Sequence, residues 1–153
     1  MSDIVGERLG EAGKIGTDLT VNSVEENLME RIMSVTNGRG ADLIIEAVGR
    51  KETWESTNSL VRKGGTILLF GGCPSGTMVD FNADKIHYGE FHLQGAFHHT
   101  PAAVERAFSL IVSGQVAIKP IVSHQMPLEK AEEALQLMGA GKALKVALRP
   151  PKS

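Results

Sequence analysis

The sequence holds a single cysteine, Cys73, among 153 residues. One cysteine excludes an intrachain disulfide framework and a cysteine-rich zinc site, and it fits a reducing compartment. The beginning of the chain has no signal-peptide pattern, and no apolar run is long enough to span a bilayer. We therefore expect a globular cytoplasmic protein without a membrane segment.

An excess of charge of one sign is absent as well. The chain has 16 Lys and Arg against 18 Asp and Glu, a formal net charge of -2, and its basic residues form no stripe along the sequence. Nucleic acids and anionic membranes are bound through clustered positive charge. The composition therefore indicates neither of them as a partner.

Patterns that carry catalysis or bind a metal are also missing. No G-x-G-x-x-G phosphate loop occurs, and no serine-histidine-aspartate order or carboxylate pair stands out. Of the five histidines, His98 and His99 are adjacent and would point to opposite faces of a strand, and the others lie in separate predicted elements. A zinc site needs three or four convergent ligands. We therefore predict no catalytic residue and no metal site in this chain, and we interpret Cys73 as structural.

What the sequence does contain is an alternation of strand and helix patterns. The apolar run Leu43-Ile44-Ile45 is typical of a strand covered on both faces, Ser23 to Glu26 match a capping box, and Thr100-Pro101 match a helix start. The expected strands are residues 18–22, 41–48, 66–70, 91–97, 121–125 and 144–148, and the expected helices are residues 24–36, 51–62, 101–113 and 128–138. A first helix over residues 5–15 contains Gly6, Gly10 and Gly13, so we expect it to be weakly held.

Strands that alternate with helices predict an α/β fold with a parallel sheet. Ligands of such sheets bind at the carboxyl ends of the strands. The predicted strand ends carry small residues, namely Gly49, Gly71-Gly72 and Gly95-Ala96, which would let a flat ligand approach the backbone. The alternative is that these glycines only make tight turns.

The order of these segments and the residues within them resemble those of the zinc-dependent medium-chain alcohol and polyol dehydrogenases, especially the sorbitol and threonine dehydrogenase branch. The resemblance runs over essentially the whole chain and rests on the ordered set rather than on any one motif. The matching stretches are Asn37-Gly38-Arg39-Gly40-Ala41-Asp42, Ile45-Glu46-Ala47-Val48-Gly49, Leu60-Val61-Arg62-Lys63-Gly64-Gly65, Leu69-Phe70-Gly71-Gly72, residues 121–128 and Gly141-Lys142-Ala143-Leu144-Lys145-Val146.

The resemblance implies a C-terminal portion of such an enzyme. Residues 1–118 would form an incomplete NAD-binding Rossmann-type domain that lacks the first strand and the Gly-rich loop, and residues 119–153 would return to a catalytic lobe that is absent here. The parent enzyme would oxidise a secondary alcohol or polyol with NAD, and the ligands of its zinc would lie outside this chain. Whether the chain alone is an enzyme stays open, and we expect it to show no turnover.

The resemblance also assigns cofactor-binding roles to particular positions. Asp3 would accept hydrogen bonds from the adenosine ribose and repel the 2'-phosphate of NADP, with Arg8 beside it, although either could be an ordinary surface residue. Side chains of Phe70 and Phe97 are expected in the core, so their contacts would be made by the main chain. The remaining residues implied are Ala47, Val48, Gly49 and Arg50 on the adenine side, Phe70, Gly71 and Gly72 on the nicotinamide-ribose side, Gly95, Ala96 and Phe97 near the carboxamide, and Lys145 near the pyrophosphate.

Alternatives to this reading remain. One is an inactive truncated remnant, and another is the zinc-free quinone-reductase branch of the same superfamily, which prefers NADP and against which Asp3 argues. Without the first strand of a 3-2-1-4-5-6 sheet, the strand at residues 41–48 becomes an open apolar edge. The strand at residues 91–97 resembles an edge that pairs across a two-fold axis. We therefore expect a homo-oligomer that forms through an edge strand.

Overall fold

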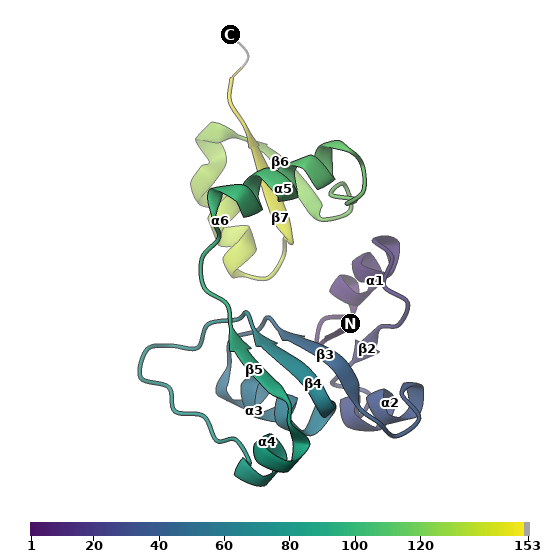
Figure 1. The fold of residues 1–153 in the computed structure, drawn as a ribbon. Helices are drawn as coiled ribbons and strands as arrows, with labels where there is room; N and C mark the ends of the chain where they lie inside the picture. Colours follow the sequence, from purple (N-terminus) through teal and green to yellow (C-terminus); the bar gives the residue numbers. More distant parts are fainter. Residues whose placement is uncertain (152–153) are drawn as a thin grey trace. The chain divides into compact units, whose positions relative to one another are not determined.

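A computed structural model describes residues 1–151 as an α/β chain with three parallel sheets, β1-β2, β3-β4-β5 and β6-β7 (Figure 1). The chain divides into a central unit, Glu25–His99, and a terminal unit made of Met1–Val24 and the segment from Thr100 onward. No helix among residues 1–151 is long and apolar enough to cross a membrane. The elements are β1 (Ser2–Asp3), α1 (Gly6–Lys14), β2 (Val21–Asn22), α2 (Leu28–Val35), β3 (Ala41–Glu46), α3 (Lys51–Leu60), β4 (Val61–Leu69), α4 (Ala83–Gly89), β5 (His92–Gly95), α5 (Pro101–Val112), β6 (Val122–Pro127), the 3-10 helix η1 (Leu128–Lys130), α6 (Ala131–Gly139) and β7 (Lys145–Arg149).

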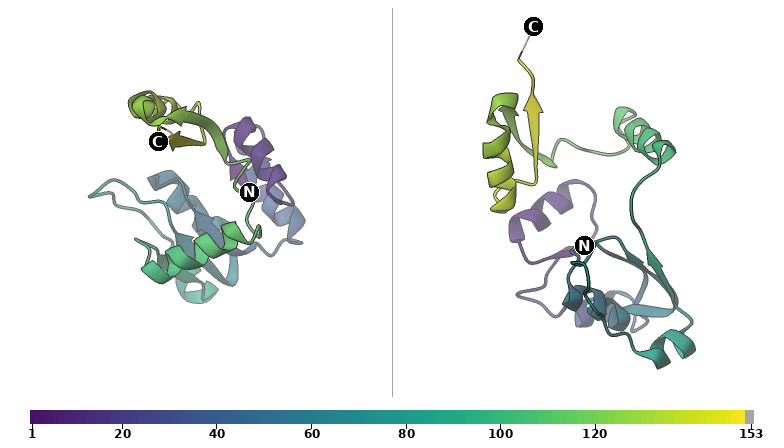
Figure 2. Two further views of the ribbon diagram at one scale, coloured as in Figure 1. Left: turned by 90° about the horizontal axis from the view of Figure 1, so that it is seen from above. Right: turned by 90° about the vertical axis from the view of Figure 1, so that its left-hand side faces the viewer.

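The core of the central unit lies on one face of β3-β4-β5, the face against which α3 packs (Figure 1 and Figure 2). Ile67 in the middle strand is fully buried, and Leu69 and Phe91 complete the buried cluster. Trp54 of α3 and Ile44 of β3 pack against it. Burial of such side chains contributes about 1.5–3 kcal/mol each, so this face and α3 hold the sheet together.

The opposite face of this sheet and the outer side of β3 are uncovered. Leu43 and Ile45 are 56% and 58% exposed, although their sequence pattern is that of a strand buried on both faces. Among the described residues β3 pairs with β4 alone, and β2 pairs with β1 alone. The predicted incomplete parallel sheet, with an open edge at this strand, is therefore confirmed.

The terminal unit contains two strand pairs. In the first, Ser2 and Asp3 pair with Val21 and Asn22, and Leu9 and Ala12 of α1 are buried together with Val21. In the second, β6 pairs with β7, and Ala134 of α6 is buried. Thr100 caps α5 through a hydrogen bond that its hydroxyl accepts from the Ala103 N–H at 3.2 Å, as Thr100-Pro101 predicted.

Three local predictions were wrong. The helix after β2 begins at Leu28 and not at Val24, because the cap is Asn27, whose side chain accepts the N–H groups of Met29 and Glu30, and not Ser23. Residues 63–65 lie inside β4 and do not separate α3 from it. Between the expected strands at residues 66–70 and 91–97, where no helix was predicted, lies α4, which Asn82 caps by accepting the Lys85 N–H.

Glu46, the last residue of β3, holds the turns that follow β3 and β4. Its carboxylate is 5% exposed and accepts the N–H groups of Val48 at 2.9 Å and of Gly49 at 3.1 and 3.2 Å. Its backbone carbonyl accepts the N–H groups of Phe70 at 2.9 Å and Gly71 at 2.8 Å. One residue therefore fixes the β3 turn (residues 47–50) with its side chain and the β4 turn (residues 70–72) with its main chain.

The same two turns touch through their glycines. Gly49 has φ of +77°, and a Cβ at this position would collide with the Gly72 carbonyl oxygen. A Cβ at Gly71 would collide with the Gly49 nitrogen. The Trp54 indole donates a hydrogen bond to the Gly71 carbonyl at 2.9 Å and closes the arrangement from α3. Neither glycine can be replaced without moving one turn away from the other.

We predict that Glu46→Ala destabilises the protein strongly. The change leaves the buried Gly49 N–H and the partly buried Val48 N–H without an acceptor, and a buried group left in this way costs about 1–3 kcal/mol. Glu46→Gln, which keeps one acceptor oxygen, is expected to lose less. Urea unfolding followed by Trp54 fluorescence measures the change, with the exposed Glu25→Ala as control. Equal unfolding free energies for the two alanine variants would show that the Glu46 contacts contribute nothing.

Replacing a glycine with alanine should have opposite effects on the stability of the protein in helix α1 and in the β3 turn. A Cβ at Gly10 meets no atom within 4 Å, and this glycine lies inside α1, so Gly10→Ala is expected to stabilise by about 1 kcal/mol. Gly49→Ala combines a positive φ with a backbone collision, so it is expected to destabilise by more than about 1 kcal/mol. Thermal melting and amide exchange in α1 provide the measurement. A loss of stability in Gly10→Ala would contradict the helical role of this residue.

Candidate functional site

The turns after β3 and β4 and the end of β5 lie at one edge of the central sheet. Glu46 pairs with Leu69 and Leu69 pairs with Gly95 in the parallel register, so the three strands end side by side. The ladder continues past Gly95 through the Ala96 N–H, which donates to the Leu69 carbonyl at 3.1 Å. Ten of the predicted site residues come together here, namely Ala47, Val48, Gly49, Arg50, Phe70, Gly71, Gly72, Gly95, Ala96 and Phe97.

The glycines of this edge fall into two classes. Gly49 and Gly71 touch the opposite turn, so the tight-turn alternative accounts for both of them. Gly72 and Gly95 are exposed, and a Cβ at either position would meet no atom within 4 Å. Their backbone is therefore open to a ligand that approaches the strand ends, which is the property the sequence predicted for this edge.

Large apolar side chains lie exposed around these open glycines. Val48 and Phe70 are 65% and 64% exposed, and Phe97 is 88% exposed. The expectation that Phe70 and Phe97 lie in the core was wrong, because both follow the last paired residue of a strand and leave the covered face. Exposed apolar groups beside accessible backbone N–H and C=O groups suit a flat, partly polar ring.

Glu46 has a positioning role here that the sequence reasoning missed. The available signal was a carboxylate directly after the apolar run Leu43-Ile44-Ile45, where a buried charge requires hydrogen-bond donors. Cys73, which follows the β4 turn, is half-buried. Its burial raises the pKa of the Cys73 thiol, and the carboxylates of Glu46 and Glu52 raise it further. A thiol in this state is a poor nucleophile at neutral pH, in agreement with a structural role.

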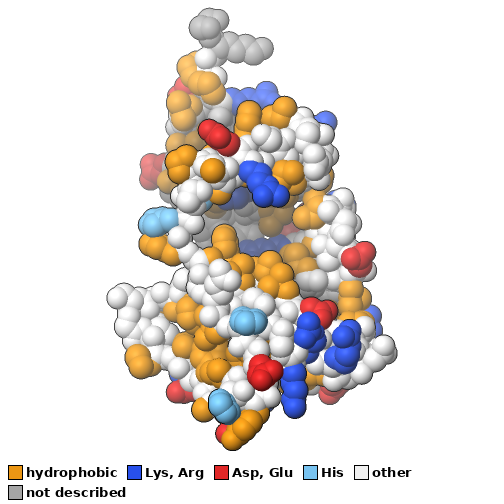
Figure 3. Space-filling model, in the orientation of Figure 1, with side chains coloured by type: hydrophobic (Ala, Val, Ile, Leu, Met, Phe, Trp, Pro, Cys, Tyr) orange, Lys and Arg blue, Asp and Glu red, His pale blue; other side chains and the backbone are white. Residues whose placement is uncertain are grey.

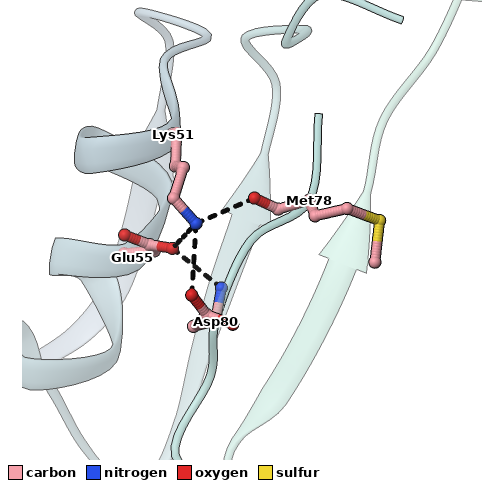
Figure 4. A network of polar contacts seen from close by, with 4 residues as sticks. All are labelled: Lys51, Glu55, Met78 and Asp80. Atoms are coloured by element: carbon pink, nitrogen blue, oxygen red, sulfur yellow. Dashed lines mark hydrogen bonds and ion pairs between the residues drawn. The ribbon is translucent and has the colours of Figure 1, made fainter. Parts of the chain in front are cut away.

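A polar network fastens the segment after the β4 turn to α3 (Figure 4). The Lys51 ammonium lies 2.6 Å from the Glu55 carboxylate and 3.2 Å from that of Asp80, and it donates to the Met78 carbonyl at 2.9 Å. The Asp80 N–H in turn donates to Glu55 at 2.8 Å. Glu55, followed by Asp80, raises the pKa of Lys51, and Lys51, followed by the Asp80 N–H, lowers the pKa of Glu55. Lys51 and Glu55 therefore both stay ionised around neutral pH.

Asp3 and Arg8 come together in the terminal unit. One Asp3 carboxylate oxygen accepts the Val5 N–H at 2.9 Å, and the other lies 3.7 Å from the Arg8 guanidinium. The Asp3 side chain is 21% exposed and that of Arg8 is 40% exposed. The second oxygen of Asp3 has only this long ion pair among the described residues, so it can accept a further hydrogen bond.

Arg8 also lines a cavity of about 650 Å³ within the terminal unit. The wall is formed by α1 and by two segments around residues 119–124 and 141–144, and it includes the cationic Lys119 and Lys142. Ser123 shapes this wall, because its hydroxyl donates to the Lys145 carbonyl and accepts the Leu144 N–H. Lys145, the last predicted site residue, is exposed at the start of β7 and does not line the cavity.

Among residues 1–151 no three His, Cys, Asp or Glu side chains converge in a way that could hold a metal ion. His98 and His99 follow β5 in irregular structure, with a positive φ of 63° at His98, so they do not lie on a strand. The donor groups of residues 1–151 therefore do not fit a zinc ion.

Comparison with known proteins gives the same relationship that the strand order and the motifs indicate. The sequence model of the zinc-binding dehydrogenase family matches residues 1–113. An L-threonine 3-dehydrogenase from Thermococcus kodakarensis is 34% identical over 92% of this chain and 41% of its own length. A sorbitol dehydrogenase from Halalkalibacterium halodurans is 29% identical over 94% of this chain and 41% of its own length.

A solved structure shows the fold as well. A putative zinc-binding dehydrogenase from Sinorhizobium meliloti, bound to NADP, superposes with a TM-score of 0.88 and 26% sequence identity, over 97% of this chain and 44% of that one. The chain spans 41% of the length of the two curated relatives. On the combined evidence of strand order, ordered motifs and a family model that covers residues 1–113, the chain belongs to the zinc-binding dehydrogenase family.

Proposed function

We propose that this chain is the cofactor-binding part of an NAD-dependent oxidoreductase that acts on a secondary alcohol or polyol. The observation that carries the proposal is the carboxyl-end edge of β3-β4-β5. There the backbone of Gly72 and Gly95 is open, and exposed Val48, Phe70 and Phe97 lie around it. A nicotinamide ring has the flat shape, apolar faces and carboxamide that such a surface can hold.

The Asp3–Arg8 pair supports NAD rather than NADP as the cofactor. The Asp3 oxygen that faces Arg8 can still accept a hydrogen bond from a ribose hydroxyl, and its charge disfavours a 2'-phosphate. Arg8 partly offsets the negative charge of Asp3, and its guanidinium could donate charge-assisted hydrogen bonds to a 2'-phosphate. The proposed preference for NAD therefore requires that Asp3, and not Arg8, faces the ribose.

In the proposed reaction, the role of this chain is to hold the cofactor in position. The cofactor, when bound, supplies the hydride acceptor. Residues 1–118 would hold it, and residues 119–153, with Lys145, would contact the pyrophosphate from a segment that belongs with a catalytic lobe. No reaction step through zinc is assigned here, because the described residues offer no convergent donor set.

Saturation-transfer NMR with NAD and NADP tests the proposal. We expect weak binding, because the chain contains no G-x-G-x-x-G loop, with signals from both the adenine and the nicotinamide protons and a preference for NAD. Asp3→Ala should reduce the ratio of the affinity for NAD to that for NADP about tenfold, since a hydrogen bond to a charged group contributes about 1.5–3 kcal/mol. The exposed Asp18→Ala serves as control. No transfer to either cofactor would overturn the proposal.

The proposal includes a homo-oligomer that forms through an edge strand. Leu43 and Ile45 are exposed on β3, whose outer backbone groups have no strand partner among residues 1–151. Exposed apolar edges favour pairing with another chain, and a charged side chain on the edge opposes it. The second edge, β5, is shorter and carries the polar His92 and Gln94.

Light scattering should report a dimer or a larger species for the unmodified chain. We expect Ile45→Lys to shift the population toward monomer, because an ammonium group at this edge would have to be desolvated on pairing. Val24→Lys, at a position that is 73% exposed outside any strand, provides the matched control. A monomeric unmodified chain, or equal effects of the two variants, would rule out pairing through β3.

A further inference from the structure

A second cavity, of about 410 Å³, lies in the central unit at the end of the sheet where the strands begin. Its wall combines the start of β4, part of α4 and Arg39, which precedes β3. The strands of a parallel sheet all run in one direction, so this cavity and the open glycines lie at opposite edges of the sheet. The proposed cofactor surface therefore makes no use of it.

Positive charge converges on this cavity although the whole chain has a net charge of -2. Four cationic side chains line it, from Arg39, Arg62, Lys63 and Lys85, against the single carboxylate of Asp84. Figure 3 shows Lys and Arg side chains gathered at the lower right, where β3 and β4 begin. Such a local excess of positive charge favours an anionic ligand.

Most of these cations have no carboxylate partner. Arg62 pairs with Asp42, and this contact, with a smaller contribution from Arg39, lowers the pKa of the Asp42 carboxyl. Arg39, Lys63 and Lys85 form no ion pair among residues 1–151. The Lys85 ammonium donates to the Ser59 hydroxyl at 3.2 Å, and this contact aims it along the cavity wall.

The rest of the wall is apolar and aromatic. Val61 and the buried Phe91 contribute the apolar part, and the Tyr88 ring, 71% exposed, lies one helical turn after Lys85. An exposed ring beside ammonium groups can stack on a planar group while the cations hold an attached phosphate. The cations surround one small cavity and do not extend along a face, which favours a small molecule over a polynucleotide.

We infer that this cavity is a binding site for a small phosphate ester with a planar base, such as a nucleoside monophosphate. The phosphate would be held by Arg39, Lys63 and Lys85, and the base would lie against Tyr88. The inference is independent of the proposed cofactor surface, because the two involve opposite edges of the sheet.

Proton NMR of the Tyr88 ring gives a reporter confined to this cavity, because the chain contains one tyrosine. The probes are AMP, adenosine, ribose 5-phosphate and inorganic phosphate. We expect AMP to shift the Tyr88 signals saturably and to bind more tightly than the two probes without a base. Adenosine should bind more weakly than AMP, and added salt should weaken AMP binding. Binding of inorganic phosphate as tight as that of AMP would overturn the role of the base.

Charge variants locate the site. Lys63→Glu with Lys85→Glu should weaken AMP binding at Tyr88 by about tenfold or more, because it removes two charge-assisted contacts. Lys119→Glu with Lys142→Glu makes the same change of charge in the cavity of the terminal unit and should leave this binding unchanged. Asp84→Asn removes the one carboxylate of the wall, so it should tighten binding while keeping the fold.

The outcomes separate this inference from the proposed function. AMP binding at Tyr88 in a chain that binds neither NAD nor NADP would support the inference alone. No saturable shift of the Tyr88 signals, equal losses in the two double variants, or weaker binding in Asp84→Asn would overturn it. If the double variant at Lys63 and Lys85 fails to fold, the change in AMP affinity of Asp84→Asn still tests the inference.

Discussion

The arrangement of the proposed cofactor surface depends on one buried carboxylate, that of Glu46. Glu46 is 5% exposed, and a buried carboxylate is costly unless hydrogen-bond donors compensate it, as the N–H groups of Val48 and Gly49 do. The carbonyl of the same residue binds the next turn, at Phe70 and Gly71. Two turns that belong to different strands are thereby held in contact, and the positions of the open strand ends follow from that contact.

The two edges of the central sheet have different chemistry for a physical reason. At the carboxyl edge, turns held by Glu46 and by touching glycines expose backbone and apolar side chains. At the amino edge, the entry into β3 and β4 brings basic side chains from separate segments around one cavity. A flat apolar ring suits the first surface, and an anionic group suits the second.

Much of the fold could be predicted from the sequence, because the alternation of apolar strands and helices depends on local periodicity. Thr100-Pro101 identified a helix start, whereas Ser23 failed because Asn27 competes for the same role four residues later. The site was predicted as strand ends, but not the part played by Glu46, since its donors come from the turn it organises. Exposure of Leu43, Phe70 and Phe97 depends on which faces are covered, and apolar character in the sequence predicted the reverse.

We propose that a pyridine dinucleotide binds at the sheet edge that Glu46 holds together. Two-dimensional amide NMR of the chain titrated with NADH tests this binding site residue by residue. We expect the amide signals of Val48, Gly72 and Gly95 to shift together, and we expect the shifts to diminish in Glu46→Gln under conditions where that variant stays folded. Shifts confined to other parts of the chain, or unchanged shifts at these amides in Glu46→Gln, would contradict the account.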